Sequence, residues 1–251
     1  MTDSSPDFAV FCQRVLKDIR YGGQPIQLAL IQLSWIAHIN YCWDRNLDAL
    51  ILAPMGHGKS TIVAVGLPLY LLGTNPNCRV KIISATDNLA KDRVGMIRQY
   101  IVSDNDYREV FPNAQPAHSE MWTQGKIYLK RDGRSPDASL ESKGVLATGA
   151  GGRCDVLILD DPSDRKNSYS DTTRRSVIDS YNLTWRTRLE PWGRTVMIAT
   201  PYHREDLIHA MKDRNSTCTL TQSVSADYAG VDFNITNAPD DNHPLLNFAQ
   251  A

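Results

Sequence analysis

Cysteine is scarce in this 251-residue chain, and the cysteines that occur do not pair. They number five, an odd count, and include no Cys-x-x-Cys pair: Cys12, Cys42, Cys78, Cys154 and Cys218. This spacing supports neither a zinc site nor a disulfide framework. We expect reduced, partly buried thiols, as in a cytosolic protein.

The chain also lacks a long apolar run, a targeting segment and an excess of one charge. No window reaches about 18 consecutive apolar residues, so we expect no membrane span. Residues 1–7 are polar and acidic, without the basic and apolar regions of a signal peptide, so we expect a protein that is not secreted. The net charge of −1 argues against a protein that coats DNA generally, but it leaves room for a basic strip on one face.

Strand-like and helix-like segments alternate along most of the sequence. This alternation predicts an α/β fold with a mostly parallel sheet covered by helices on both faces. Pro68 should kink the helix in which it lies. The expected strands are 48–53, 79–85, 126–130, 156–160, 195–199 and 217–225. The expected helices lie within 7–46, with a break at Gly22-Gly23, and at 59–72, 88–102, 171–189 and 205–213.

Two stretches depart from this alternation. Residues 112–150 are rich in Pro, Gly, Asp and Ser, and we interpret them as a β-hairpin insertion with loops. After about residue 226 the chain becomes polar and irregular. We therefore expect one domain over 1–225, with 1–46 as a helical lead-in, and a linker or loose tail over 226–251.

The most informative stretch is 53–61, Ala-Pro-Met-Gly-His-Gly-Lys-Ser-Thr, which joins a strand-like run to a helix-like one. Such a Gly-rich loop cradles phosphates with its backbone N–H groups and the helix N-terminus. Lys59 can reach the β- and γ-phosphates, and Ser60 can hold Mg²⁺. Ala53 stands where the pattern has glycine, and a chance Gly-Lys-Ser turn is the alternative. The residues expected to bind ATP or GTP are Pro54, Met55, Gly56, His57, Gly58, Lys59, Ser60 and Thr61.

A second motif follows about a hundred residues later. Residues 155–162 read Asp-Val-Leu-Ile-Leu-Asp-Asp-Pro, an apolar strand that ends in two carboxylates. Such a strand suits the middle of a buried parallel sheet, whose carboxyl ends are where ligands bind. This is a Walker B pattern, in which Asp160 would hold Mg²⁺ and Asp161 would act as the general base. The alternative is a carboxylate cap on a turn after a core strand.

A third strand-like run, 194–199, ends at Thr200-Pro201-Tyr202-His203. A threonine at the end of a strand beside Walker B can sense the γ-phosphate and relay its loss. We therefore expect Thr200 and Pro201 to couple the nucleotide state to the helix that follows. That helix begins with acidic residues, which its dipole favours.

Taken together, these motifs resemble the N-terminal ATPase domain of the large terminase subunit of tailed bacteriophages. Three segments carry the resemblance: 53–60, the Gly-rich approach 148–155 that leads into Asp160-Asp161, and 187–207 with its Ala-Thr-Pro-Tyr-His run. The similarity extends from about residue 25 to 225. It implies a P-loop NTPase of the additional-strand (ASCE) type.

The resemblance also implies an activity and partners. The chain would hydrolyse ATP to ADP and phosphate with Mg²⁺ and drive double-stranded DNA into a procapsid, in the cytoplasm of an infected bacterial host. It would assemble with itself in a homo-oligomeric ring and contact a portal protein and a small terminase subunit. Full terminases continue into a nuclease domain, so we expect no DNA cleavage by this chain alone.

The family usually has an arginine in the Walker A loop, and here that position is Met55. Transition-state charge must then be neutralised from elsewhere, and an arginine finger is worth about 10³–10⁵ in rate. By resemblance Arg153 is the first candidate, acting in trans on a neighbouring subunit, and Arg188 is the second. Arg153 could instead pair with Asp155 or an exposed carboxylate, and Arg188 could lie on a solvated helix face.

Further contacts follow from the resemblance. An adenine contact is expected upstream of Walker A, where Gln32 and Gln27 occur; both could equally be surface residues. Sequence-independent DNA contacts would come from basic side chains on exposed loops, through phosphates. The candidates are Lys126, Lys130, Arg131, Arg134, Arg174 and Arg175, and each could be an ordinary solvated residue.

Two other functions fit the same motifs. A helicase-type ATPase would normally need a second motor domain with its own arginine finger, which this sequence does not contain. A nucleotide-binding switch, or a small-molecule kinase, would bind ATP without the coupling to DNA. DNA-stimulated ATP turnover without strand separation favours the packaging ATPase over both.

Overall fold

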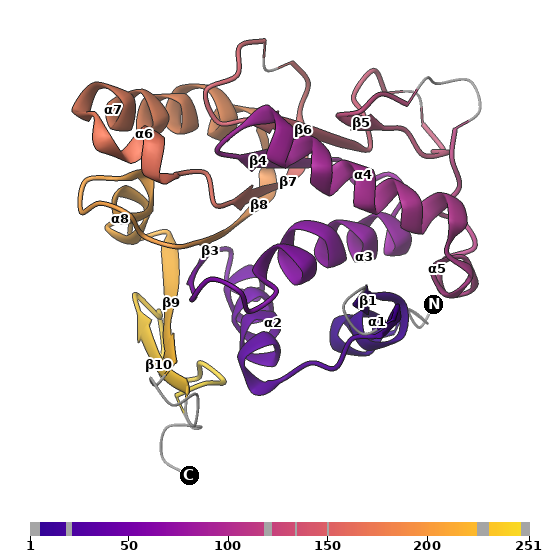
Figure 1. Cartoon of the computed structure of the whole chain (residues 1–251), viewed down its shortest axis with the longest axis horizontal. Coiled ribbons are helices and arrows are strands. Elements are labelled where there is room, and N and C mark those ends of the chain that lie inside the picture. The colour runs from indigo at the N-terminus through magenta and orange to yellow at the C-terminus, as the bar shows by residue number, and fades with distance from the viewer. Residues whose placement is uncertain are drawn as a thin grey trace.

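An eight-stranded sheet forms the centre of the molecule, and helices pack on both of its faces (Figure 1). The computed structural model describes residues 6–18, 22–117, 122–133, 135–149, 151–224 and 231–246. The strand order is β10-β9-β3-β8-β7-β4-β6-β5. Neighbours from β9 to β6 run parallel, whereas β10 and β5 pair antiparallel at the two edges. The strands are β3 (Asp48–Leu52), β4 (Val80–Ser84), β5 (Lys126–Ile127), β6 (Leu140–Gly144), β7 (Cys154–Asp160), β8 (Leu189–Ala199), β9 (Thr217–Val224) and β10 (Val231–Thr236).

Six of the described helices (α1, α4, α5, α6, α7 and α8) begin where a polar side chain accepts an otherwise unpaired N–H group. Thr86, for example, accepts from Leu89, and Asp206 accepts from His209. The helices are α1 (Phe8–Val15), α2 (Leu30–Asp44), α3 (Leu67–Thr74), α4 (Asp87–Ser103), α5 (Asn105–Val110), α6 (Arg165–Tyr169), α7 (Asp171–Ser180) and α8 (Leu207–Lys212). Two π-helical segments, η2 (Ser60–Gly66) and η3 (Tyr181–Trp185), and a 3₁₀ turn, η4 (Arg186–Arg188), adjoin them.

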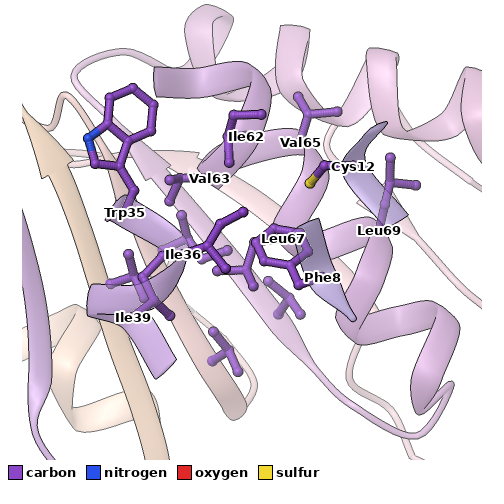
Figure 2. Close-up of a cluster of buried hydrophobic side chains, with 14 of the residues drawn as sticks. Phe8, Cys12, Trp35, Ile36, Ile39, Ile62, Val63, Val65, Leu67 and Leu69 are labelled. Atoms are coloured by element: carbon purple, nitrogen blue, oxygen red, sulfur yellow. The ribbon is translucent and has the colours of Figure 1, made fainter. Parts of the chain in front are cut away.

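The core has two halves, one on each face of the sheet, because side chains alternate along each strand. On β3, Ile51 belongs to the cluster under α1 to α5, whereas Leu50 and Leu52 belong to the cluster under α7 and α8. Figure 2 shows part of the first cluster, where Trp35 and Ile36 of α2 lie beside side chains of η2. Both faces of the central strands are buried, which explains their continuous apolar sequences.

Most of the expected elements are present, with changes at their ends. A small antiparallel pair, β1 (Lys17–Asp18) and β2 (Gln24–Pro25), interrupts the helical lead-in around Gly22 and Gly23, both at positive φ. The helix expected at 59–72 divides into η2 and α3, and Pro68 lies in the first turn of α3. Because proline has no N–H to donate, it is tolerated at this position.

The block 112–150 contains the expected antiparallel pair, formed by β5 and β6. The sequence did not indicate that this block also extends the central sheet. It does so because β6 pairs in parallel with β4, from Val80↔Leu140 to Ser84↔Gly144. The pattern of β6, Leu-Glu-Ser-Lys-Gly, gives little sign of a buried strand. Its Glu141 is buried because it forms ion pairs with Lys81 and Lys126.

The expectation of a loose tail after residue 226 is wrong for 231–246. β10 pairs with β9 along its whole length, and Phe233 and Ile235 pack against the core. Beyond it Leu245 is buried, and Asp240 forms an ion pair at 2.8 Å with Arg45, the residue that follows α2. Apolar residues that alternate with polar ones and a few specific contacts thus tie this segment to the domain.

One expectation concerns membranes. Among the described residues, no helix combines the length and apolar character that a membrane crossing requires.

Candidate nucleotide-binding site

The carboxyl ends of three parallel strands bring the sequence motifs together. β8 lies between β3 and β7 and pairs with both, so the residues after these strands meet at one edge of the sheet. The loop 53–59 follows β3, and Thr200 follows β8. Asp160 is the last residue of β7, and Asp161 comes directly after it. A strand inserted between the Walker A and Walker B strands is the feature for which the additional-strand type is named. The edge is the expected ligand site of an open α/β sheet.

The loop conformation depends on two glycines. Gly56 has φ +83° and Gly58 has φ +78°, and a Cβ added to either would meet nothing within 4 Å. Glycine is therefore needed for backbone freedom at these positions and not for space. His57 Nδ1 lies 2.9 Å from the Met55 carbonyl oxygen, which closes the loop on itself. The Met55 side chain is 68% exposed, so this position contributes an apolar group and no charge.

Lys59 is buried, 6% exposed, with its ammonium directed to three oxygens. Nζ donates to the Ala53 carbonyl at 3.2 Å and to the Thr200 hydroxyl, and lies 3.5 Å from Asp161 Oδ2. An ammonium has three protons to donate, and each has a partner here. The residue thus joins the ends of all three strands.

Ser60 and Asp160 form a pair of oxygens that suits Mg²⁺. The Ser60 hydroxyl donates to Asp160 Oδ1 at 2.8 Å. Ligands at right angles around Mg²⁺ at 2.0–2.1 Å stand about 2.9 Å apart, so the two oxygens could occupy adjacent positions with little movement. A hydroxyl and a carboxylate are also the hard donors that this ion prefers.

Arg93 is a member of the site that the sequence motifs did not indicate. Its Nε donates to Asp160 Oδ2 at 2.8 Å, and Asp160 is 2% exposed. The guanidinium comes from α4, which follows β4, and β4 lies next to β7 in the sheet. Both oxygens of the Asp160 carboxylate are therefore held, one by Ser60 and one by Arg93.

Asp161 lies between Lys59 and Thr200. Its backbone is in the left-handed region at φ +44°, which is uncommon for a residue other than glycine. Oδ1 accepts the Thr200 N–H at 2.8 Å, while Oδ2 faces Lys59. Burial raises the pKa of Asp161, and the nearby Lys59 ammonium partly opposes this shift. A carboxylate with a raised pKa at a strand end has the properties of a general base.

Thr200 connects this cluster to α8. Its hydroxyl accepts from Lys59 and its N–H donates to Asp161. Beyond Pro201, the N–H groups of Tyr202 and His203 both donate to Asp206 Oδ2 at 3.2 Å, and Asp206 caps α8. The Lys59 ammonium is therefore connected to the start of α8 by its hydrogen bond to Thr200, by the backbone through Pro201, and by the hydrogen bonds to Asp206.

A pocket of about 1000 Å³ lies beside the loop. Gln32 and Gln27 both line it, as do His57 and Thr61. Gln32 stands in the first turn of α2, where its Oε1 accepts from the Ala29 N–H and its Nε2 donates to the His57 carbonyl, both at 2.8 Å. The two glutamines thus lie next to the phosphate loop, as an adenine contact requires.

The two candidate arginine fingers lie elsewhere. Arg153 precedes β7 and Arg188 precedes β8, so both stand at the amino edge of the sheet, opposite the loop. The Arg153 side chain is 55% exposed and lies 4.0 Å from Glu190. Asp155 pairs with Arg79 at 2.8 Å instead. Neither arginine reaches the nucleotide site of its own chain, so their role in trans stays a prediction.

The candidate DNA-contacting residues differ in exposure and in whether they already pair with other groups of the protein. Arg174 is buried and forms ion pairs with Asp171 and Glu205, which makes it a structural residue. Lys126 pairs with Glu141 at 3.2 Å, and Arg131 donates to the backbone of Pro76 and Asp137. The candidate Arg134 lies outside the described residues. The exposed candidates are Lys130 and Arg175.

Comparison with solved structures finds a phage large terminase with a similar fold, and weaker likenesses beyond it. The large terminase of bacteriophage HK97 aligns with a TM-score of 0.56 at 18% identity, over 82% of this chain and 40% of that chain. The ATPase domain of the Thermus phage P74-26 large terminase aligns with a TM-score of 0.41 at 18% identity. The alignment covers 70% of this chain and 66% of that chain. A DEAD box protein from Methanococcus jannaschii aligns with a TM-score of 0.43 at 14% identity. The alignment covers 75% of this chain and 48% of that chain.

The likeness to the HK97 protein confirms the expected fold class, a mostly parallel sheet flanked by helices. This chain spans less than half the length of the HK97 protein. No family model and no curated protein sequence matches it.

Proposed function

We propose that this chain is the ATPase domain of a viral large terminase, which hydrolyses ATP to move double-stranded DNA into a procapsid. The supporting observation is the convergence of Lys59, Ser60, Asp160, Asp161 and Thr200 on one edge of a sheet with the HK97 terminase fold. Each of these side chains has a chemical role in hydrolysis of a phosphoanhydride. The ring, the portal protein and the small subunit are partners within the same proposal.

In this mechanism the loop amides and Lys59 hold the β- and γ-phosphates. Ser60 and Asp160 would hold Mg²⁺, which would supply positive charge beside the phosphate oxygens as their negative charge develops. Asp161 accepts the proton of the attacking water. When ATP binds, the Lys59 ammonium moves from Asp161 and Thr200 to the γ-phosphate. When that phosphate leaves, the ammonium contacts Thr200 again, and Thr200 transmits this change of contact to α8.

The proposal is tested by ATP turnover of the purified chain with and without linear duplex DNA. We expect stimulation by duplex DNA that weakens steeply with added salt, because the contacts are to phosphates. A strand-displacement assay run in parallel should give no separated strands. Strand separation would indicate a helicase instead, and ATP binding without turnover under any of these conditions would indicate a switch.

Arg93 should set the Mg²⁺ requirement. In Arg93→Gln the Asp160 carboxylate loses the partner that fixes one of its oxygens, and such partners are typically worth 10–100-fold in metal affinity or activity. We expect the Mg²⁺ concentration for half-maximal turnover to rise about tenfold or more. Arg108→Gln, an exposed arginine of α5 bonded to Asn105, is the matched control. An unchanged Mg²⁺ titration in Arg93→Gln would mean that the ion pair only supports the fold.

Arg153 should act on the neighbouring subunit. Arg153→Ala and Asp161→Asn, each inactive alone, should recover part of the wild-type turnover when mixed, because a mixed ring contains interfaces with both intact groups. The loss in Arg153→Ala should be about 10³-fold or more if it is the finger. The same mixture with Arg188→Ala tests the second candidate. Full activity of Arg153→Ala by itself would exclude it.

A further inference from the structure

A serine next to Asp160 carries a hydroxyl that the described part of the protein does not satisfy. Ser84 is the last residue of β4 and is 1% exposed. Its Oγ is buried and has no hydrogen-bond partner among the described residues. A buried hydroxyl without a partner destabilises a fold, because water satisfies the same group in the unfolded chain. Such a group at the edge that carries the candidate nucleotide site calls for an explanation.

Ser84 and Asp160 lie side by side on the sheet. β4 and β7 are neighbouring parallel strands (Figure 1), and their register pairs Ser84 with Asp160. Side chains alternate along a strand, and Ile82 and Ile158, two residues earlier, both belong to the core cluster under α1 to α5. The side chains of Ser84 and Asp160 are therefore directed to that same face, from strands about 5 Å apart.

The groups that hold Asp160 are on this face as well. Ser60 begins η2 and Arg93 belongs to α4, and both elements contribute side chains to the same core cluster. Ser60 donates to one oxygen of Asp160 and Arg93 to the other, each at 2.8 Å. Asp160 is itself only 2% exposed, so the deep burial of Ser84 is usual for this site. Ser84 adjoins this arrangement without making any of its hydrogen bonds.

The coordination chemistry of Mg²⁺ gives such a hydroxyl a role. The ion requires an octahedron of oxygen ligands and usually keeps several of its waters. Ser60, Asp160 and the phosphates would not fill the octahedron, so water molecules would complete it. The protons of these waters need acceptors, and a serine oxygen has lone pairs to offer.

We propose that Ser84 Oγ accepts a hydrogen bond from a water molecule of the Mg²⁺ shell, which makes Ser84 a positioning residue of the metal site. This rests on the proposed function, because the ligand is ATP with Mg²⁺. Partners of this kind, outside the ligand shell, are typically worth 10–100-fold in metal affinity or activity. The sequence motifs did not indicate Ser84 because it meets Asp160 only through the pairing of two strands that are distant in sequence.

Ser142→Ala is the matched control for Ser84→Ala. Ser142 lies on β6, one strand further from Asp160, and its Oγ is likewise buried and unpaired among the described residues. Both variants lose a buried hydroxyl, but only Ser84 adjoins the metal site. Without nucleotide and metal, we expect each variant to melt at or above the temperature of the wild type, because an unsatisfied group has been removed.

Metal binding is then measured without turnover, as the melting temperature in saturating β,γ-imido ATP over a series of Mg²⁺ concentrations. We expect Ser84→Ala to need about tenfold or more Mg²⁺ for half of the stabilisation. Ser142→Ala should follow the wild type. Turnover is not part of this measurement, so an effect on Mg²⁺ binding is separated from an effect on the chemical step.

Superimposed Mg²⁺ titrations of Ser84→Ala and the wild type would overturn the proposal, as would an equal shift in Ser142→Ala. A lower melting temperature of Ser84→Ala without nucleotide and metal would also overturn it, because the hydroxyl would then be satisfied within the fold. A wild-type protein whose melting temperature responds to neither the analogue nor Mg²⁺ would instead contradict the proposed function itself. The two failures are therefore distinguished by the wild-type titration.

Discussion

Lys59→Ala should lower ATP turnover by about 10³-fold or more and leave the chain folded. The ammonium contacts both Asp161 and Thr200. Removing one hydrogen-bond donor that stabilises the negative charge of a transition state lowers the rate by about 10²–10³-fold. Lys59 also positions the phosphates, so the loss should be at the upper end. Turnover is measured under saturating ATP and Mg²⁺, with the far-ultraviolet circular dichroism spectrum as the test of folding.

The control for this prediction is Lys166→Ala, which removes an exposed lysine of α6. Its turnover should match that of the wild type. Lys59→Arg adds a second comparison, because it keeps the charge but changes the geometry of a group enclosed by three oxygens. Turnover of Lys59→Ala within tenfold of the wild type would mean that the loop is not the catalytic phosphate site.

Asp161→Asn should retain ATP binding and lose about 10²–10⁴-fold in turnover, because the amide keeps the shape of the side chain but cannot accept a proton. Its carbonyl oxygen can still accept the Thr200 N–H, so the strand ends should keep their arrangement. Binding is measured by the fluorescence of a labelled ATP analogue and turnover by phosphate release. Asp213→Asn, an exposed aspartate after α8, is the matched control.

The wild-type pH profile should report the same residue. A base must be ionised to act, and burial raises the pKa of Asp161 above the ordinary value of 3.8. Turnover at a low ATP concentration should therefore be lost as the pH falls through the raised pKa of Asp161. This loss should occur at a higher pH than it would for an aspartate with the ordinary pKa. Normal turnover by Asp161→Asn, or an acid limb at the ordinary value, would show that another group takes the proton.

The sequence was sufficient for the site wherever the information was local. The glycines of 53–60 specify a loop conformation, and the apolar run 156–159 specifies a strand buried on both faces; neither depends on distant residues. The position of Thr200 beside Asp161 also followed, because parallel strands place their carboxyl ends on one edge. These are the residues that the structure brings together.

What the sequence could not provide depends on strand order. Arg93 reaches Asp160 because β4 adjoins β7, and no pattern within α4 indicates that neighbour. β6 was missed because Glu141 is neutralised by a lysine on the adjacent strand, which removes the apolar signal of burial. The strand at 231–236 was different: Phe233 and Ile235 alternate with polar residues, so its signal was available in the sequence.

β7 has a mechanical consequence for the proposed ring. Arg153 stands immediately before this seven-residue strand and Asp161 immediately after it. The strand spans about 23 Å at 3.3 Å per residue, is bonded to β4 on one side and β8 on the other, and cannot shorten without breaking those bonds. In the ring that we propose, a subunit displaced at its Arg153 edge would therefore transmit that displacement to its own Asp161, and hydrolysis at neighbouring sites would be sequential.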